Sequence, residues 1–544
     1  MSGDPSNARI AEVLDELGRL YKLDGAIVHR VRAYSRAAKA VREAQVSVAA
    51  LAREGRASDL AGIGATLQEK ILALAETGTI PALEKLRAKI PPESLPERPD
   101  AQSVPRVLLP KALELGQALA DGLREIGGPG TEVTIAGSAR RMADSVKDID
   151  LVAVTRKPVT LAKGLALLPE VEEVSSAGRT GARGRSHSGT KIDLRIAKPA
   201  QLGNLLQHFT GSGEHNVALR ERAVRRGLHV SEYGIADEES ATKTMCASER
   251  EVYGLLGLAY IEPELREDRG ELAAAALDFQ RTGGSASTAS GQASGGLPKL
   301  IELEDIRGDL HCHTVASDGH HTIEEMAEGA RERGYEYLAI TDHSASHGFG
   351  NDVSPAQLRE QIELVRAANE RIEGIEVLAG SEVNILPDGS LDYEDDLLAE
   401  LDWVIASVHT SFRMGEQKMT ERMIAAIEHP RVDAIGHPTG RLIERREPYE
   451  VDIGAVIEAA ARTGTMLEIN ANPDRRDLNE VHARAAAEAG APILIDSDAH
   501  WVERLGAMRW GIATARRAWL TAADVANTRP WAEFAKLRKR TRAV

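Results

Sequence analysis

Cysteine and long apolar runs are both scarce in this chain, and each scarcity excludes a class of protein. Only two of the 544 residues are cysteines, Cys246 and Cys312, so a disulfide framework is excluded and a reducing compartment is expected. No apolar run approaches the ~18 residues of a transmembrane helix, and the polar segment Met1–Arg9 predicts no signal peptide. We therefore expect a cytoplasmic protein, with roughly three or four domains at about 150 residues each.

An excess of positive charge, the simplest sign of a nucleic-acid partner, is also lacking, since the net charge is −16. Residues 299–544 account for all of it, with 28 Lys/Arg against 44 Asp/Glu, whereas residues 1–90 hold 14 against 11. The acidic half also contains 11 of the 16 histidines. Carboxylates together with imidazoles are the ligands of a polynuclear metal site, so we expect such a site in that half.

Apolar spacing and composition divide the chain into three folded parts and two linkers. Apolar residues three and four apart predict short helices in residues 1–90. Residues 91–106 contain five prolines and predict a linker, and residues 107–265 predict an α+β domain in which a helix precedes several strands. Residues 266–298 include a long Gly/Ser-rich run and predict a flexible tether.

Residues 299–544 repeat a short apolar strand and a helix at intervals of roughly 30 residues. Seven such units indicate a parallel, barrel-like α/β sheet. The predicted strands lie at Asp309–His313, Leu338–His343, Val377–Glu382, Val404–His409, Ala434–His437, Met466–Asn470 and Ile493–Asp498.

Three aspartates of the second part form a candidate catalytic site. Asp148 and Asp150 are two apart on a predicted strand, so their side chains project from the same face. Asp193 lies within another apolar strand, where an uncompensated inward carboxylate costs several kcal/mol. Clustered carboxylates can hold two Mg²⁺ ions, one activating a hydroxyl and one binding a triphosphate.

A Gly-Ser loop upstream of the aspartate pair completes this constellation. Gly137 and Ser138 offer backbone N–H groups and a hydroxyl to a phosphate, and Arg141 offers a charge-assisted partner. A lone Asp-x-Asp pair is usually a solvated strand end, but the loop and the strand aspartate argue against that interpretation. The constellation resembles the nucleotidyltransferase palm of family X DNA polymerases.

This resemblance continues on both sides of the palm. Phe209-Thr210-Gly211-Ser212 with Asn216 is similar to the family's nucleotide pocket, in a thumb-like subdomain where Phe209 packs against the sugar and Asn216 reaches the base edge. The resemblance implies that Phe209, Gly211 and Asn216 bind the nucleotide, together with the Gly-Ser loop. It also implies two Mg²⁺ or Mn²⁺ ions at the three aspartates, and dNTPs as substrates.

Residues 1–90 resemble the family's helical, lyase-like DNA-binding domain. The turn at residues 62–64 is similar to a helix–hairpin–helix, whose backbone amides hold a DNA phosphate without reading sequence. Lys70 matches the family's Schiff-base lysine for removing a 5′-deoxyribose phosphate, although a solvated helix lysine is the alternative interpretation. The implied DNA-binding residues are Gly62, Ile63, Gly64, Tyr34 and Arg30.

In the third part, His, Asp or Glu closes nearly every predicted strand. His311 and His313 are two apart and project in the same direction, whereas Cys312 points away and is predicted to be structural. The carboxyl ends of barrel strands form the catalytic mouth. Nine N/O ligands are too many for one tetrahedral zinc and suit two or three metals of Mn²⁺, Zn²⁺ or Fe type. The residues His320, His321 and His347 fit no strand end and are predicted as loop residues.

This part resembles a PHP (polymerase and histidinol phosphatase) domain over its whole length. Segments 436–441 and 468–473 are close to those of bacterial family X polymerases. Because every ligand position is filled, the resemblance implies an active 3′→5′ exonuclease, 3′-phosphatase or abasic-site endonuclease. The implied metal ligands are His311, His313, Asp318, His343, Glu382, His409, His437, Asp498 and His500.

Together these features predict a bacterial-type family X DNA repair polymerase with a C-terminal PHP nuclease. It would fill gaps in primer–template DNA, as in base excision repair, while the PHP site cleans 3′ ends; we expect it in the bacterial cytosol at the nucleoid, where other repair proteins are further partners. One alternative is a 3′-end-processing or abasic-site nuclease whose shortened polymerase half mainly binds DNA, because residues 91–136 lack the family's second helix–hairpin–helix. A non-catalytic repair scaffold is the third hypothesis, and the complete ligand sets argue against it.

Overall fold

The computed structural model describes residues 4–24, 28–89, 106–283, 295–348 and 351–539. Its described residues form two compact units, one within 1–141 and 145–256, the other within 142–144 and 257–544. No helix in the described ranges combines the length and the apolar character needed to cross a membrane. The proline-rich linker and most of the Gly/Ser-rich run that the sequence predicts lie outside the described residues.

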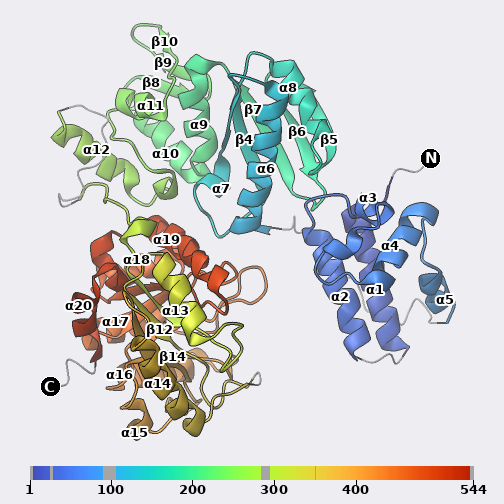
Figure 1. Cartoon of the computed structure of the whole chain (residues 1–544). Helices are drawn as coiled ribbons and strands as arrows, with labels where there is room; N and C mark the ends of the chain where they lie inside the picture. The colour runs from blue at the N-terminus through green and yellow to red at the C-terminus, as the bar shows by residue number, and fades with distance from the viewer. Residues whose placement is uncertain (1–3, 25–27, 90–105, 284–294, 349–350, 540–544) are drawn as a thin grey trace. The chain divides into compact units, whose positions relative to one another are not determined.

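The N-terminal part is helical, as the apolar spacing predicts (Figure 1). Its α-helices are α1 (Asn7–Leu23), α2 (Val28–Glu43), α3 (Val48–Arg53), α4 (Ala65–Thr77) and α5 (Pro81–Lys89). The hydroxyl of Ser6 caps α1 by accepting a hydrogen bond from the backbone N–H of Arg9. Along α1, Ile10, Leu14 and Leu17 recur at helical spacing and are fully buried in the core that this helix shares with α2.

The palm is built on a five-stranded sheet with the order β2-β4-β7-β6-β5. Its strands are β2 (Glu132–Ile135), β4 (Asp148–Val154), β5 (Val171–Gly178), β6 (Gly181–Ser186) and β7 (Lys191–Ala197). β4 and β7 run parallel, and the other pairs are antiparallel. The strands that the sequence predicts around the aspartates are therefore present, and they are neighbours in the sheet.

Helices cover both faces of this sheet. On one face, Ile149, Leu151 and Ala153 of β4 pack with α6 (Leu109–Gly127) and α8 (Pro158–Gly164). On the other face, Val152 of β4 packs with Leu205 of α9 (Leu202–Thr210). Side chains alternate along a strand, and the odd-numbered apolar residues of β4 face α6 and α8. The even-numbered aspartates of β4 therefore project from the face that α9 covers.

A smaller subdomain follows the palm sheet. It contains α10 (Gly213–Val224), a three-stranded antiparallel sheet of β8 (Leu228–Ser231), β9 (Gly234–Asp237) and β10 (Lys243–Thr244), and α11 (Glu249–Leu255). Two short strands, β1 (Val107–Leu108) and β3 (Ser145–Val146), pair separately, and the one-turn helix α7 (Gly137–Arg140) lies between β2 and β3 in the chain. The sequence predicts a nucleotide-pocket segment here but not these strands.

The C-terminal part is a nearly closed barrel of seven parallel strands in sequential order. The strands are β11 (Gly308–Cys312), β12 (Tyr337–Ile340), β13 (Glu376–Asn384), β14 (Trp403–Ser407), β15 (Ala434–Ile435), β16 (Met466–Asn470) and β17 (Ile493–Asp496). A parallel bridge between Cys312 and Ala499 joins the first strand to the last. This architecture is the one that the seven strand–helix repeats predict.

Helices alternate with the strands and cover the barrel. They are α13 (Ile323–Glu332), α14 (Pro355–Asn369), α15 (Asp395–Leu398), α16 (Glu416–Glu428), α17 (Ile453–Thr463), α18 (Glu480–Glu488), α19 (Met508–Arg517) and α20 (Trp531–Phe534). Three of them, α13, α14 and α16, contribute Met326, Ile362 and Met423 to the main core, which also contains strand residues such as Leu338 and Val404.

The barrel interior has an apolar layer and a polar layer. The starts of β12 and β14 contribute Tyr337 and Trp403, which pack with Phe534 of α20 in a separate core cluster. Ile405 belongs to this cluster as well, two residues after Trp403 on β14. Ser407 ends this strand, and His409 follows two residues later on the next loop. One end of the interior is therefore filled by apolar side chains, and the ligand end by polar ones.

The structure corrects the sequence prediction in two respects. Residues 266–298, predicted as a flexible tether, include the helix α12 (Glu271–Arg281), whose Ala274 and Ala275 are buried. The segment before α12 is held to the barrel by an ion pair of 2.8 Å between Glu267 and Arg517. The prediction missed α12 because the Gly/Ser-rich run that follows dominates the composition, whereas residues 271–281 are rich in alanine and charged residues, which form helices. Several barrel strands also end before their predicted ligands, which lie on the loops that follow.

Candidate active sites

Three carboxylates meet at one edge of the β4–β7 pair. Asp150 is the register partner of Asp193 on the neighbouring strand, and Asp148 is the partner of Lys191. Ile149 between the two aspartates is fully buried on the opposite face. The structure thus brings together the three residues that the sequence analysis selects, on the face covered by α9.

The three carboxylates at this edge repel one another when they are ionised. Burial, together with the nearby carboxylates of Asp148 and Asp193, raises the pKa of Asp150 to about 7. Two arginines pair with Asp193, at 3.3 Å from the Arg183 Nε and 2.8 Å from the Arg195 Nε. A buried carboxylate that resists ionisation beside two others is the donor set that divalent cations such as Mg²⁺ compensate, so these residues fit such a metal.

The Gly-Ser loop lies directly against the trio. Gly137 has φ of +64°, and a Cβ added there would lie 2.1 Å from the Oδ2 atom of Asp150. Only glycine meets both conditions without displacing the carboxylate. Ser138 follows on the one-turn helix α7 and is half-buried, directly after the glycine that lies against Asp150.

Two arginines connect this loop to the nucleotide-pocket segment. Arg141 donates a hydrogen bond of 2.8 Å to the carbonyl of Thr210. Its neighbour Arg140 forms a bidentate pair with the nearly buried Glu249, with N···O distances of 3.0 and 2.6 Å. The sequence analysis selects Arg141 but not Arg140, whose partner is over a hundred residues away in the chain.

The nucleotide-pocket segment at residues 209–216 is tightly folded. The guanidinium of Arg195 lies 5.2 Å from the centre of the Phe209 ring. Asn216 donates hydrogen bonds to the carbonyls of His208 and Gly211, at 2.7 and 3.2 Å. A Cβ on Gly211 would come within 2.8 Å of the Asn216 side chain. These contacts fix the position of Asn216 beside the end of α9.

The helix–hairpin–helix turn of the N-terminal part has the expected backbone geometry. Gly62 has φ of +93° and Ile63 is buried in the helical core, while Gly64 caps α4. Lys70 lies half-buried on α4. The first turn of this helix therefore has free N–H groups on the exposed side of the turn, which is the feature that holds a phosphate.

The two predicted phosphate-binding residues of α2 differ in exposure. Arg30 is exposed and lies 4.2 Å from the centre of the Tyr21 ring. Tyr34 is buried and stacks on Tyr21, with ring centroids 5.2 Å apart. Burial and the neighbouring Tyr21 raise the pKa of Tyr34 to about 12. The structure places Arg30 at the surface and Tyr34 within the core.

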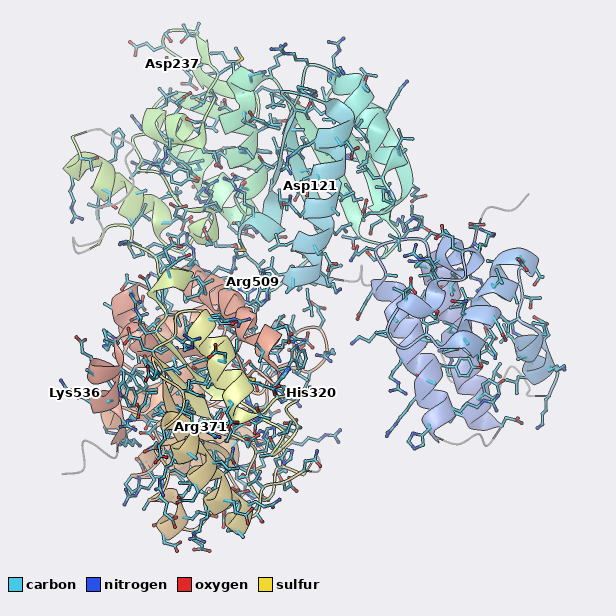
Figure 2. The ribbon with its side chains drawn as sticks, viewed as in Figure 1. Asp121, Asp237, His320, Arg371, Arg509 and Lys536 are labelled. Carbon is cyan, nitrogen blue, oxygen red and sulfur yellow. The ribbon has the colours of Figure 1, made fainter. Side chains whose placement is uncertain are left out.

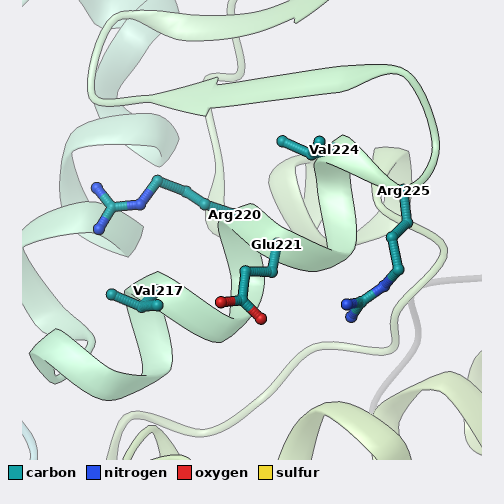
Figure 3. Close-up of a pocket in the computed structure, with 5 residues that line it drawn as sticks. All are labelled: Val217, Arg220, Glu221, Val224 and Arg225. Atoms are coloured by element: carbon teal, nitrogen blue, oxygen red, sulfur yellow. The ribbon is translucent and has the colours of Figure 1, made fainter.

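A shallow pocket lies on the exposed side of α10, with a volume of about 450 Å³ (Figure 3). Figure 3 shows Arg220 and Arg225 extending from this helix beside Glu221. Val217 and Val224 on the same surface are about half exposed. Sequence reasoning did not select this surface, which combines two cations with two apolar side chains.

In the barrel, the nine predicted ligands converge on one site. Nearly all are deeply buried, and Glu382 of β13 lies at the centre. Its carboxylate is 2.8 Å from His343 Nδ1 and 3.0 Å from His437 Nε2. Asp498 Oδ1 lies 3.2 Å from His313 Nε2 on the other side.

The ligand atoms form three overlapping groups, each compact enough to hold one metal ion. The groups are His313, Asp318, His343 and His500; His311, His313 and Glu382; and His343, Glu382 and His409. Each pair of groups shares one residue. Sharing of this kind is typical of a polynuclear centre, in which one ligand bridges or lies between two ions.

The hydrogen bonding of these atoms supports the same conclusion. His311 Nε2, His313 Nε2 and Glu382 Oε2 are buried, yet none makes a hydrogen bond of good geometry to another described residue. The distances from Glu382 Oε2 to the two imidazole nitrogens are 3.4 and 3.8 Å. Buried polar atoms are rarely left in this state unless an ion or water satisfies them. The residues therefore fit a divalent metal.

The pKa values of the cluster diverge strongly. Burial, with the neighbouring His500 and His343, lowers the pKa of His313 to about 4. Burial also opposes protonation of His500, but its hydrogen bond to Asp318 and the charge of Asp498 outweigh it and raise its pKa to about 9. Such opposed shifts among adjacent groups are typical of functional sites.

Several residues around the ligands were missed or placed differently by sequence reasoning. His347, predicted as a loop residue, is buried and stacks on the ligand His343 with ring centroids 4.2 Å apart. Asp342 accepts hydrogen bonds from Thr314 and Ser317, which fastens the loop between His313 and Asp318. His320 lies after Asp318, on the connection that leads to α13 (Figure 2), and is a loop residue as predicted. No strand-end pattern could have found His347, because its role depends on how a loop folds back.

One cation lies at the edge of the ligand cluster. Arg475, on the loop after β16, is partly exposed, and its Nε atom is 3.7 Å from Asp498 Oδ2. Its charge also contributes, after burial, to the lowering of the pKa of His437 to about 3. Arg475 is therefore close enough to the ligands to contact an anion that binds there.

The fold and the two candidate sites define a class of protein: a mixed sheet that carries three carboxylates, followed in the chain by a seven-stranded barrel with a cluster of candidate metal ligands. Family models match three segments of the chain. Residues 5–80 match the helix-hairpin-helix domain, residues 205–267 match the DNA polymerase beta thumb, and residues 309–472 match the PHP domain.

Known proteins with similar sequences fall into two groups. The DNA polymerase/3′-5′ exonuclease PolX of Bacillus subtilis is 40% identical over 396 residues, which cover 72% of this chain and 66%, just under two thirds, of that relative. A probable phosphatase of Thermoanaerobacter sp. is 34% identical over 239 residues, 40% of this chain and 89% of the relative. Another, from Caldanaerobacter subterraneus, is 36% identical over 35% of this chain and 75% of its own length. The chain therefore contains a helix-hairpin-helix domain, a DNA polymerase beta-type thumb and a PHP domain, and it is similar to a DNA polymerase/3′-5′ exonuclease over 72% of its length.

Proposed function

We propose that this protein is a DNA repair polymerase that extends primer 3′-OH ends in gapped DNA, coupled to a PHP phosphoesterase that processes 3′ ends. The observation that carries the proposal is that one chain contains both constellations: three carboxylates at one edge of the palm sheet, and in the barrel seven expected ligands in compact groups with His437 and Asp498 beside them. The name of the Bacillus subtilis relative, which states both activities, supports it.

In the palm, the aspartates and the Gly-Ser loop would have different roles. Asp148, Asp150 and Asp193 would hold two Mg²⁺ or Mn²⁺ ions, which when bound supply the positive charge for a triphosphate and a reacting hydroxyl. The backbone at Gly137 and the hydroxyl of Ser138 would bind phosphate oxygens beside them. Asp193 would also accept or orient the proton of the primer 3′-OH.

The nucleotide itself would be held by the segment that Arg141 ties to the Gly-Ser loop. Phe209 would pack against the sugar and Asn216, fixed by its bonds to the backbone, would reach the base edge. Gly211 is needed there because a larger residue would displace Asn216. This arrangement couples the position of the base to that of the carboxylates.

In the barrel, the nine ligands would hold two or three divalent ions of the Mn²⁺, Zn²⁺ or Fe type, which when bound polarise phosphate and lower the pKa of water. Arg475 would bind a non-bridging phosphate oxygen at the edge of the cluster. The loop that Asp342 fastens keeps Asp318 in place among the imidazoles. A phosphodiester or phosphomonoester at a 3′ terminus fits this chemistry.

DNA would be bound at sequence-independent contacts. The turn at Gly62, Ile63 and Gly64 would hold one phosphate and the exposed Arg30 another, while Tyr34 supports Arg30 through Tyr21. Lys70 would serve as the Schiff-base nucleophile for a 5′-deoxyribose phosphate. The remaining partners that we propose are other repair proteins, in the bacterial cytosol at the nucleoid.

A second function is favoured by one observation. Between α5 and the Gly-Ser loop, the described residues contain only β1, α6 and β2, with no second helix–hairpin–helix. In family X polymerases that module grips the primer strand. The alternative is therefore a 3′-end-processing or abasic-site nuclease whose polymerase half mainly binds DNA.

A single gel separates the two functions. A 5′-labelled primer in a one-nucleotide gap is incubated with dNTPs and Mn²⁺, beside the variants Asp193→Ala and His343→Ala. We expect lengthening that disappears only in Asp193→Ala and shortening that disappears only in His343→Ala. Shortening without lengthening would establish the nuclease alternative, and neither product would contradict both.

A further inference from the structure

One barrel strand contributes none of the nine ligands, and its inward side chains contact the ligands instead. Every other strand, or the loop that directly follows it, supplies at least one ligand. β16 ends in Glu468-Ile469-Asn470, and Ile469 belongs to the core between barrel and helices. Glu468 and Asn470 therefore project together to the opposite, inner side, and both are fully buried.

The two oxygens of Glu468 are both engaged by N–H donors. Its Oε1 atom lies 2.7 Å from Nδ1 of His311. Its Oε2 atom accepts hydrogen bonds from the backbone N–H of His437 and from the side-chain amide of Asn470, the latter at 3.2 Å. With its oxygens occupied in this way, Glu468 is not in a position to ligate a metal itself.

Asn470 extends the network to a third ligand. Its amide nitrogen donates to Asp498 Oδ2 at 3.1 Å, and its amide oxygen accepts from the backbone N–H of Asn472 at 3.0 Å. The second bond fixes which end of the amide faces Asp498. Through these two side chains, β16 touches His311, His437 and Asp498.

The contact with His311 determines which ring nitrogen is available. A carboxylate at Nδ1 requires a proton on that atom, so the lone pair is left on Nε2. Nε2 is the nitrogen that faces the cluster, 3.4 Å from Glu382 Oε2 and 3.7 Å from Asp498 Oδ1. Carboxylates that accept from the far nitrogen of a metal-binding histidine orient the ring and strengthen its binding.

We propose that Glu468 and Asn470 are positioning residues of the barrel's metal centre, which hold His311, His437 and Asp498 in their ligating orientations. The inference rests on the proposed function of the barrel as a metal-dependent phosphoesterase, and extends it to residues that do not touch metal. Loss of such outer partners lowers metal affinity by about 10- to 100-fold.

The test measures binding of Mn²⁺ alone to the full-length protein, after chelator treatment, by competition with a coloured chelator and by metal analysis. Glu468→Gln keeps the volume of the side chain but replaces one acceptor oxygen by a donor, so it cannot accept from His311 and His437 together. Asp433→Asn is the matched control, because Asp433 is a buried barrel carboxylate that accepts from the backbone N–H groups of Val404 and Lys539 and contacts no ligand.

We expect Glu468→Gln to lower the affinity for one equivalent of Mn²⁺ by 10- to 100-fold, and we expect high Mn²⁺ to restore its phosphoesterase activity. Asp433→Asn should bind Mn²⁺ with the affinity of the parent. Asn470→Ser, which removes the contact to Asp498, should weaken binding as well and serves if Glu468→Gln does not fold. Thermal unfolding of each variant reports whether its barrel is folded.

Two results would overturn the inference. If Glu468→Gln and Asn470→Ser bind Mn²⁺ as tightly as the parent, these residues position nothing. If the unmodified protein binds no Mn²⁺ at the barrel, the proposed phosphoesterase function fails, and the inference fails with it. The binding of the unmodified protein thus separates the two failures.

Discussion

Gly137 and Asp150 are in direct contact across the palm site, and the contact leaves no room for a side chain on the glycine. A Cβ at residue 137 would lie 2.1 Å from Asp150 Oδ2, and the backbone there has φ of +64°. The phosphate-binding loop and the carboxylate that would hold metal are thus adjusted to each other. A change in either one is expected to displace the other.

Gly137→Ala should therefore abolish most primer extension while leaving the barrel intact. The left-handed backbone and the collision with Asp150 cost about 1–3 kcal/mol each, and a displacement of about 1 Å at a reacting group lowers rates by about a hundredfold. The measurement is single-nucleotide extension beside hydrolysis of a 3′-phosphorylated oligonucleotide. Gly130→Ala is a control, because a Cβ there meets no atom within 4 Å although its φ is also positive. Unchanged extension in Gly137→Ala would contradict the contact.

Asp150→Asn should stabilise the metal-free palm at high pH and not at low pH. The pKa of Asp150 is raised to about 7 from 3.8, so the folded state keeps a proton that the unfolded state loses, and stability falls as pH rises from about 4 to 7. A tenfold change in proton affinity is equivalent to about 1.4 kcal/mol, so the loss reaches about 4 kcal/mol at most.

Thermal unfolding of the full-length protein in EDTA, at pH 4, 6 and 8, checks this expectation. The difference between Asp150→Asn and the parent should grow with pH and should shrink when Mg²⁺ is added, because the cation compensates the carboxylate. A difference that is the same at all three pH values would show that folding does not raise the pKa of Asp150.

Removal of single ligands should release different numbers of metal ions. His343 belongs to two of the three ligand groups, whereas His409 belongs to one. We expect His343→Ala to lose up to two metal equivalents and His409→Ala to lose one, as measured by metal analysis after dialysis. Equal losses from both variants would argue against shared ligands and in favour of a single ion.

Arg475→Gln should weaken substrate binding at the barrel more than it affects metal binding. A charge-assisted hydrogen bond contributes about 1.5–3 kcal/mol, so kcat/KM for a 3′-phosphorylated oligonucleotide should fall by about 10- to 100-fold, mostly through KM. Arg462→Gln is the control, since Arg462 is exposed and pairs with Glu428 on the surface. If both variants keep the parent's KM, Arg475 does not contact the phosphate.

Lys70→Ala should abolish any covalent product with an abasic site. Reduction with borohydride traps a Schiff base between a lysine and the sugar of a 5′-deoxyribose phosphate, and the trapped complex is seen on a denaturing gel. Lys85→Ala, at an exposed lysine of α5, should trap as the parent does. Trapping that survives in Lys70→Ala would assign the lyase chemistry to another residue.

Much of this protein could be predicted from the sequence because its patterns are local. Alternation along a strand places Asp148 with Asp150, and His311 with His313, on one face whatever the rest of the chain does. The seven strand–helix repeats and the strand-end ligands follow from the same rule, since the carboxyl ends of parallel strands meet at one edge. The sequence by itself therefore determined the fold class and selected the candidate residues that lie together at each site.

Only the tertiary structure decided how these residues are supported. His347 stacks on His343 through a loop, and Glu468 reaches His311 across 157 residues of chain. α12 was hidden within a segment whose composition indicated a tether. Such contacts depend on the register of the strands and on the path of the loops, and the local periodicity of apolar residues predicts neither. The sequence determined which groups gather at each site, because strand geometry is local. The structure decided which of their atoms face one another, because orientation is set by neighbours distant in the chain.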